Sequence, residues 1–267
     1  MIKTVIVGKN SFVTKSITKN LTNPVIISAT QINKELINYK LNKFKKINLI
    51  FNNFYPSKFL NKLTHKNFEQ FCNLSLENIS LILGTIPPSK INKIIYSSSA
   101  AIYRLLENLK NNKKDFFNRE LYSSFKIAAE KIIINYSERN NKCYHIMRLF
   151  NTYGNPNDKF SFVEKIIRSK KNKSSIILIN NGLSLRDFIH IDDVGKIYSI
   201  FLKKKITKGI YDIGTGNGYL IKDLISNANF KKNKILKKNK IEEIKNSIAD
   251  IRKLKYEIGN FKFKNEN

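Results

Sequence analysis

Cysteines are few in this sequence, and long apolar runs are missing. Cys72 and Cys143 form neither a metal-ligand spacing nor a disulfide framework. No apolar run reaches the eighteen or so residues that a bilayer span needs, and the opening MIKTVIVGKNSF lacks the cleavage site of a secretory signal. We therefore expect a cytoplasmic protein without a membrane segment or a bound metal, large enough at 267 residues to bury a sizeable core.

Acidic residues are also scarce. The chain has 20 Asp and Glu against 49 Lys and Arg, a net charge of +29. A basic surface attracts phosphate groups without regard to sequence. However, the excess of basic residues is almost all Lys and is spread along the chain. It accompanies abundant Asn and Ile, a combination that A+T-rich coding DNA would produce. No nucleic-acid recognition motif is present. We expect no specific nucleic-acid partner, although a positive field would favour anionic substrates such as nucleotide sugars.

Glycines and acids are missing where a dinucleotide site would usually have them. Residues 3–7 form a β-branched run that ends at Gly8, and a helical pattern follows. Free N–H groups at such a turn suit a pyrophosphate. The dinucleotide fingerprint has three glycines, whereas Ser11 and Thr14 stand at the second and third places. The second strand, 24–28, lacks the acidic residue that commonly holds the adenosine ribose, so these residues do not decide between NAD and NADP.

Short apolar strands alternate with amphipathic helices along the first part of the chain. This order predicts an α/β fold with a doubly wound, parallel, Rossmann-like sheet and ligands at the carboxyl ends of its strands. We expect a dinucleotide-binding domain over 1–150 and a smaller substrate-binding region over 151–267, with parts of about 183–215 returning to the main sheet. The predicted strands are 3–7, 24–28, 47–51, 93–96 and 143–150, and a helix over 68–83 is predicted to end at Gly84.

The candidate catalytic residues lie at a serine-rich strand end and in a Tyr-x-x-x-Lys pair. Tyr122 and Lys126 are four residues apart in a helical segment, so they share one helix face. A nearby ammonium favours the phenolate, which predicts a lowered pKa for Tyr122 and a role as general acid or base. Composition alone supplies about two such pairs, and the other, Tyr39 and Lys43, has no accompanying features. We interpret that second pair as a solvated helix face.

Six segments, taken in order, resemble the extended short-chain dehydrogenase/reductase family, in particular its NAD-dependent epimerase/dehydratase branch, which acts on nucleotide sugars. They cover the first turn, the serine segment, the Tyr-Lys helix, two segments near the sugar-nucleotide site and a glycine-rich turn. The segments are 8–14, 96–103, 122–126, 148–154, 185–194 and 211–218.

The resemblance assigns roles to individual residues. Tyr122 would exchange a proton with a sugar hydroxyl, Lys126 would lower its pKa, and Ser99 would bind the same oxygen. NAD is the implied cofactor, with NADP open, and a homodimer is the implied assembly. The implied cofactor-binding residues are Gly8, Ser11, Phe12, Val13, Ser97, Tyr122 and Lys126; the implied substrate-binding residues are Ser99, Asn151 and Arg186.

The residues after Ser99 discriminate between activities. The family's dehydratases have an Asp-Glu pair there, and this chain has Ala100 and Ala101. Without a second acid-base pair, elimination of water is disfavoured, so epimerisation is the first hypothesis. Two alternatives stay open, a nucleotide-sugar ketoreductase and a non-catalytic nucleotide-binding member of the family.

Several other polar residues have structural interpretations. We expect a packed His190, Asp192 and Asp193 at a helix start, and a structural turn over 214–218. Asn151 could close a turn. Arg186 could pair with Asp187 or Asp192, although we favour a contact with the substrate diphosphate because a guanidinium matches phosphate oxygens.

Overall fold

The computed structural model describes residues 2–52, 64–110, 117–158, 161–231, 234–238 and 244–264. The chain divides into two compact units. The first comprises Met1–Arg148 and Tyr198–Tyr211, and the second Leu149–Ile197 and Asp212–Asn267. Among the described residues, no helix has the length and apolar character needed to cross a bilayer.

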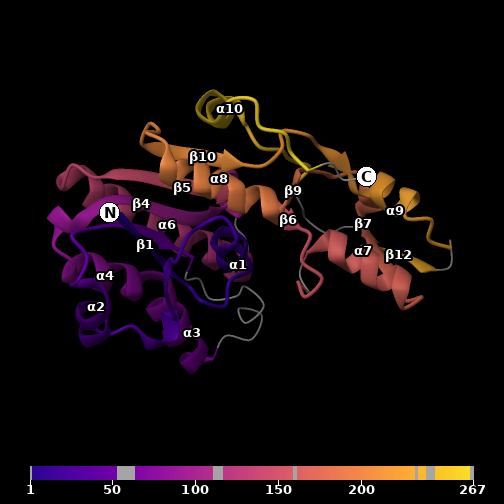
Figure 1. Ribbon diagram of the computed structural model, residues 1–267. Coiled ribbons are helices and arrows are strands. Elements are labelled where there is room, and N and C mark those ends of the chain that lie inside the picture. The colour runs from indigo at the N-terminus through magenta and orange to yellow at the C-terminus, as the bar shows by residue number, and fades with distance from the viewer. Residues whose placement is uncertain are drawn as a thin grey trace. The chain divides into compact units, whose positions relative to one another are not determined.

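A six-stranded sheet organises the first unit (Figure 1). Its order is β10-β5-β4-β3-β1-β2, and β1 pairs in parallel with both β2 and β3, as β3 does with β4. The predicted parallel, doubly wound sheet is therefore confirmed. The direction in which successive strands are added reverses at β1, because β2 lies on one side of it and β3 on the other. Strand β2 is at the edge of the sheet. In the classic dinucleotide-binding order, one more strand lies beyond the corresponding strand. The strands are β1 (Ile2–Val7), β2 (Val25–Ile27), β3 (Lys46–Phe51), β4 (Ile91–Ser99), β5 (Cys143–Leu149) and β10 (Gly209–Ile213).

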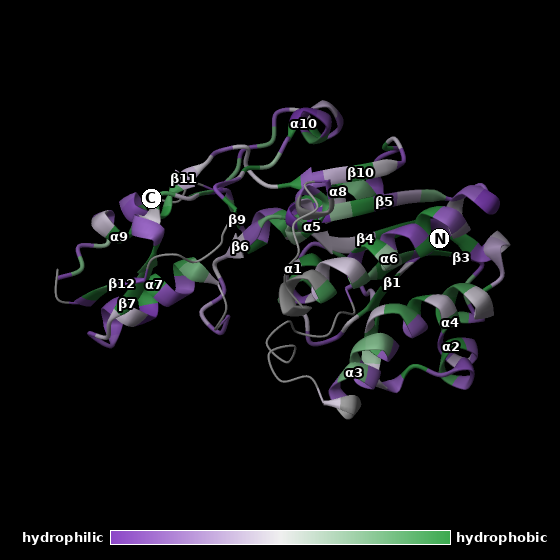
Figure 2. Cartoon of the chain, turned by 180° about the vertical axis from the view of Figure 1, so that it is seen from behind, coloured by the Kyte–Doolittle hydropathy of each residue, from purple (hydrophilic) through white to green (hydrophobic). Residues whose placement is uncertain are grey.

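The two faces of the sheet are covered by different helices. Alternation along β4 sends Ile94 and Tyr96 into a core with α2, α4 and α6. On the opposite face, Lys93 Nζ donates to Phe201 O at 2.7 Å. The hydrophobic colouring follows the strands of this sheet (Figure 2). The helices are α1 (Phe12–Thr18), α2 (Lys34–Leu41), α3 (His65–Cys72), α4 (Asn78–Thr85), α5 (Ala101–Lys110), α6 (Phe117–Arg139) and α8 (Ile191–Lys203).

The helix predicted over 68–83 contains a wider turn and ends later than expected. A π-helical turn, η3 (Asn73–Glu77), joins α3 to α4. Gly84 lies inside α4, and the cap residue is Ile86, in an extended conformation. The predicted end at Gly84 is wrong: the helix ends at Thr85, because Pro87 restricts the residue before it, Ile86, to extended conformations.

Short sheets and helices make up the second unit. β8 (Leu185–Arg186) lies between β11 (Tyr219–Leu220) and β13 (Asn246–Ser247), β7 (Ile176–Ile179) pairs with β12 (Ile235–Lys238), and β6 (Asn151–Tyr153) pairs with β9 (Phe188–His190). The helices of this unit include α7 (Phe162–Lys171), α9 (Ile221–Asn227) and α10 (Arg252–Ile258). The last of these helices, α10, follows the strand β13, which is paired with β8.

Candidate active site

The serine segment ends β4, and its side chains alternate between the faces of the sheet. Ser98 Oγ donates to Glu130 Oε1 at 2.6 Å. On the other face, the hydroxyls of Ser97 and Tyr198 are hydrogen-bonded at 2.7 Å, and Ser97 Oγ also donates to Asn52 Oδ1. Ser97 and Ser98 are thus both engaged in the core, and Ser99, at the end of the strand, is the partly exposed member of the set.

Tyr122 and Ser99 are hydrogen-bonded through their side chains. Tyr122 lies on α6, and Ser99 Oγ also accepts from Ala101 N at 3.2 Å, which fixes its position at the start of α5. Burial raises the pKa of Tyr122 to about 12, and the hydrogen bond from Ser99 opposes this rise. The structure thus brings together the two predicted hydroxyls, with Tyr122 held as a phenol.

Lys126 lies one turn along α6 and is buried. Its Nζ donates to Ser97 O at 2.6 Å and is 4.8 Å from the ring centroid of Tyr96 and 5.9 Å from that of Tyr122. Burial lowers the pKa of Lys126 to about 7, and the charge of Glu130 opposes this shift. The direction expected for Tyr122, a lowered pKa, is not what this structure shows, because burial of the phenol raises its pKa by more than the hydrogen bond from Ser99 lowers it.

A buried ion pair supports this arrangement, and the sequence did not reveal it. Arg148 donates to Glu130 through Nε at 3.1 Å and through Nη2 at 2.8 Å. Its guanidinium is 4.9 Å from the ring centroid of Tyr103. Burial acts to lower the pKa of Arg148, but hydrogen bonds to Glu130 and Tyr103 outweigh it and raise the pKa. Glu130 lies four residues after Lys126 on α6, so the two share one helix face. This spacing is the sequence signal that could have indicated Glu130 as part of the site.

In the turn after β1, Thr14 stands at the place of the third glycine and makes buried hydrogen bonds there. Gly8 has a φ of 112°, which favours glycine. Thr14 is buried, and its Oγ1 donates to Gly8 O at 2.7 Å and accepts from Asn52 Nδ2 at 3.1 Å. The Thr14 side chain therefore stabilises the turn from the inside.

The remaining predicted cofactor residues belong to the same turn. Ser11 is the N-cap residue of α1, and Phe12 and Val13 are the first residues of that helix. N–H groups in the first turn of a helix have no intrahelical acceptor. These residues, with Gly8 in its glycine-specific conformation, fit a dinucleotide pyrophosphate.

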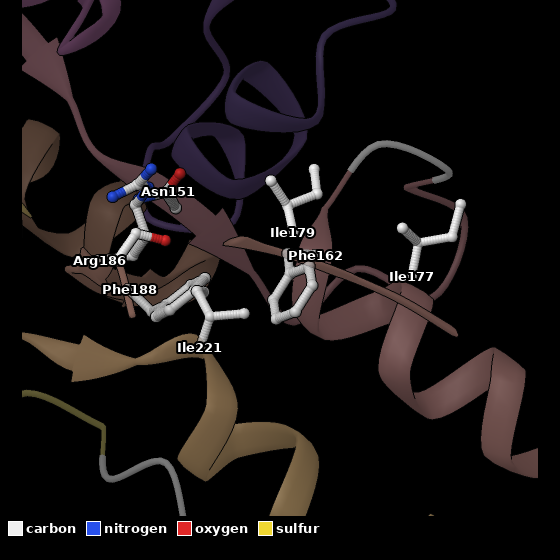
Figure 3. A pocket seen from close by; sticks show the side chains of 8 residues that line it. Asn151, Phe162, Ile177, Ile179, Arg186, Phe188 and Ile221 are labelled. Carbon is white, nitrogen blue, oxygen red and sulfur yellow. The ribbon is translucent and has the colours of Figure 1, made fainter. Parts of the chain in front are cut away.

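Asn151 and Arg186 line one pocket of about 170 Å³ in the second unit. Asn151 lies at the start of β6 and Arg186 at the end of β8, and Figure 3 shows both at the polar side of the pocket, with Ile177 at the opposite end. Arg186 Nη1 donates to Leu185 O at 2.8 Å, and Asn151 Nδ2 donates to Asp187 O at 2.8 Å. The rest of the lining is mostly apolar: Phe162, Ile177, Ile179, Ser184, Phe188 and Ile221.

Asp187 is fully buried and organises the glycine-rich turn. Its carboxylate accepts from Thr215 N at 2.9 Å, Gly216 N at 2.8 Å and Ala249 N at 3.2 Å. A Cβ at Gly214 would stand 2.6 Å from Asp187 Oδ2. The turn over 214–218 has the structural role that we expected.

The paired carboxylates and the histidine near α8 are also structural. Asp192 and Asp193 lie in the first turn of α8, and the buried Asp193 accepts from Lys264 N at 2.6 Å. His190 packs edge-on against Tyr153 at 5.0 Å and accepts from Asp192 N through Nδ1 at 3.2 Å. Burial lowers the pKa of His190. These contacts agree with our structural interpretations.

Comparison with known proteins places the chain in a family. A dTDP-D-glucose 4,6-dehydratase of Dictyostelium discoideum is 27% identical over 164 residues, which are 56% of this chain and 38% of that protein. The chain therefore spans less than half of that relative.

Solved structures share the fold over the whole chain. A UDP-N-acetylglucosamine 4-epimerase from Methanobrevibacter ruminantium is 19% identical, with a TM-score of 0.74 over 99% of this chain and 94% of that one. A Thermus thermophilus UDP-glucose 4-epimerase in complex with NAD is 13% identical, with a TM-score of 0.72 over 96% and 93%. The NAD dependent epimerase/dehydratase family model matches residues 69–214, more than half of the sequence, and the chain belongs to this family.

Proposed function

We propose that this protein is an NAD-dependent nucleotide-sugar epimerase. The observation that carries this proposal is the hydrogen bond between Tyr122 and Ser99, with Lys126 one turn away on the same helix. Bound NAD would take a hydride from a sugar carbon and return it to the other face of the ring. NAD itself is supported by the family and by the NAD complex of the Thermus relative.

Tyr122 exchanges the proton in this proposal. As a phenolate it takes the proton of the sugar hydroxyl while hydride leaves the carbon that bears it, which gives a ketone. As a phenol it gives the proton back when hydride returns. Ser99 orients the same oxygen, and Lys126 stabilises the phenolate when it forms. The turn containing Gly8, Ser11, Phe12 and Val13 would hold the cofactor pyrophosphate.

The pocket of Asn151 and Arg186 would bind the nucleotide part of the substrate. The guanidinium of Arg186 suits the diphosphate because its planar fork matches phosphate oxygens. The apolar lining suits the flat face of a base. Ala100 and Ala101 follow Ser99 without a carboxylate, and this favours epimerisation over dehydration.

A nucleotide-sugar ketoreductase is the second candidate. Burial holds Tyr122 as a phenol, which is the form that gives a proton to a ketone. A reductase would release its oxidised cofactor after each turnover, whereas an epimerase would regenerate it.

Two measurements test the proposal. Mass spectrometry of small molecules released from the purified protein should show NAD or a nucleotide sugar. Incubation with UDP-glucose and related sugars, with and without added NAD, should then give a C4 epimer. Stoichiometric NADH consumption with a keto sugar, and no epimer, would identify a reductase. Failure to bind any dinucleotide would favour a non-catalytic member of the family.

A further inference from the structure

The carboxyl end of β2 bears hydroxyl groups where a dinucleotide site commonly has a carboxylate. Ser28 stands twenty residues after Gly8, about the spacing at which an Asp or Glu holds the ribose 2′-hydroxyl. Ser28 Oγ and Thr30 Oγ1 are hydrogen-bonded at 3.0 Å on the surface. The next carboxylate in the sequence is Glu35, which is exposed in the first turn of α2.

A lysine follows the neighbouring strand at the same edge of the sheet. Val7 of β1 is in register with Ile27 of β2, and Gly8 N donates to Ile27 O at 2.9 Å. Lys9, exposed, comes directly after Gly8, and Ser28 comes directly after Ile27. Since a lysine side chain is long and flexible, its ammonium can reach an anion bound at the hydroxyl pair.

Space for an adenosine opens beside these residues. Ala29, Thr30 and Ile32 line a pocket of about 440 Å³ together with residues of α3, η3 and α4. Asn78 Nδ2 donates to Ala29 O at 2.8 Å and so connects α4 to the segment that follows β2. Glu77, from the π-helical turn, is the carboxylate in this lining. Among the described residues no strand pairs with β2 on the side away from β1, so β2 forms the edge of the sheet here.

We propose that this ribose site accepts a 2′-phosphate, so that the protein binds NADP(H) as well as NAD(H). The hydroxyls of Ser28 and Thr30 donate to the phosphate oxygens, and Lys9 supplies the positive charge. A carboxylate at residue 28 would exclude the phosphate by repulsion between like charges. The inference rests on the proposed function, because it concerns the cofactor of that function.

Titration of the purified protein with NADH and NADPH, followed by nicotinamide fluorescence, tests this inference without turnover. We expect the two dissociation constants to lie within about tenfold of each other. Ser28→Asp should weaken NADPH about 100-fold or more and leave NADH within about threefold, because only NADPH carries the repelled phosphate. Lys9→Ala should weaken NADPH about tenfold. Lys19→Ala, at the exposed end of α1, is the matched control and should change neither.

The outcomes separate this inference from the proposed function. Tight NADH binding with NADPH more than about 100-fold weaker would overturn the inference and leave the epimerase proposal standing. Tight NADPH binding that Ser28→Asp does not affect would overturn the role of this site. If neither dinucleotide binds, both the inference and the cofactor part of the proposed function are wrong.

Discussion

The ammonium of Lys126 donates to the backbone carbonyl of Ser97 at 2.6 Å. This contact joins the middle of α6 to the end of β4, the two elements that carry Tyr122 and Ser99. Lys126 therefore has two functions in our account, one in the chemistry and one in holding the helix against the strand.

Tyr122→Phe should lower the epimerisation rate by about 10²- to 10⁴-fold, the usual contribution of a general acid or base. The ring keeps its packing against neighbouring apolar residues, so the melting temperature should hardly change. Tyr39→Phe is the matched control, because Tyr39 belongs to the other Tyr-x-x-x-Lys pair and is 84% exposed. Equal activities of the two variants would show that Tyr122 is not the general acid or base.

Lys126→Met should flatten the pH dependence of stability between pH 7 and 10. The pKa of Lys126 is about 7 in the folded protein and about 10.4 in an unfolded chain. In this window the unfolded state binds more protons, so the free energy of unfolding of the wild type should rise with pH. Urea denaturation at several pH values measures this slope. Lys43→Met should keep the wild-type slope; a steep slope in Lys126→Met would contradict the burial of this charge.

Arg148→Leu should cost about 3–5 kcal/mol of folding free energy, because it leaves Glu130 buried without its partner. The double variant Glu130→Leu/Arg148→Leu should recover much of this loss, since neither charge of the pair remains. Arg252→Leu is the control, because Arg252 pairs with Asp250 on the surface. Denaturant unfolding compares the three. A single variant as stable as the wild type would show that the pair is not buried.

Thr14→Val should destabilise the protein by about 1–3 kcal/mol, because Gly8 O and Asn52 Nδ2 lose a buried hydrogen-bond partner. The variant should also weaken NADH binding, since Gly8 begins the turn proposed for the pyrophosphate. Thr18→Val removes a hydroxyl that bonds Lys15 O on the surface, and should be nearly neutral. Unchanged stability and NADH affinity in Thr14→Val would contradict this role for the hydroxyl.

Arg186→Ala should raise the dissociation constant of a UDP-sugar about 10- to 100-fold, the loss expected for hydrogen bonds to a charged group. NADH affinity should stay unchanged, because Arg186 is proposed to contact the substrate alone. Isothermal titration measures both constants. Arg168→Ala, on α7, is a control that keeps the pocket lining intact. A larger effect on NADH than on the UDP-sugar would contradict the assignment.

The sequence predicted the sheet and the Tyr122–Lys126 spacing from local patterns, whereas the pairing of Ser99 with Tyr122 followed from the resemblance to the family. Strand ends and helical spacing are visible in consecutive residues. The pKa direction of Tyr122 was not predictable, since it depends on how deeply α6 packs against β4. The burial of Thr14 was equally hidden, because its partner Asn52 lies at the end of another strand. The pairing of β7 with β12, about sixty residues apart, has no local signal either.

The most direct test of the account uses a UDP-sugar with deuterium on the carbon to be epimerised. Tyr122 moves only the hydroxyl proton in our proposal, while hydride leaves this carbon and returns to it. The account predicts that the epimer formed in ordinary water keeps its deuterium, and that Tyr122→Phe forms almost none of it. Loss of the deuterium to solvent, or no epimer from any nucleotide sugar with NAD present, would contradict the proposed epimerase.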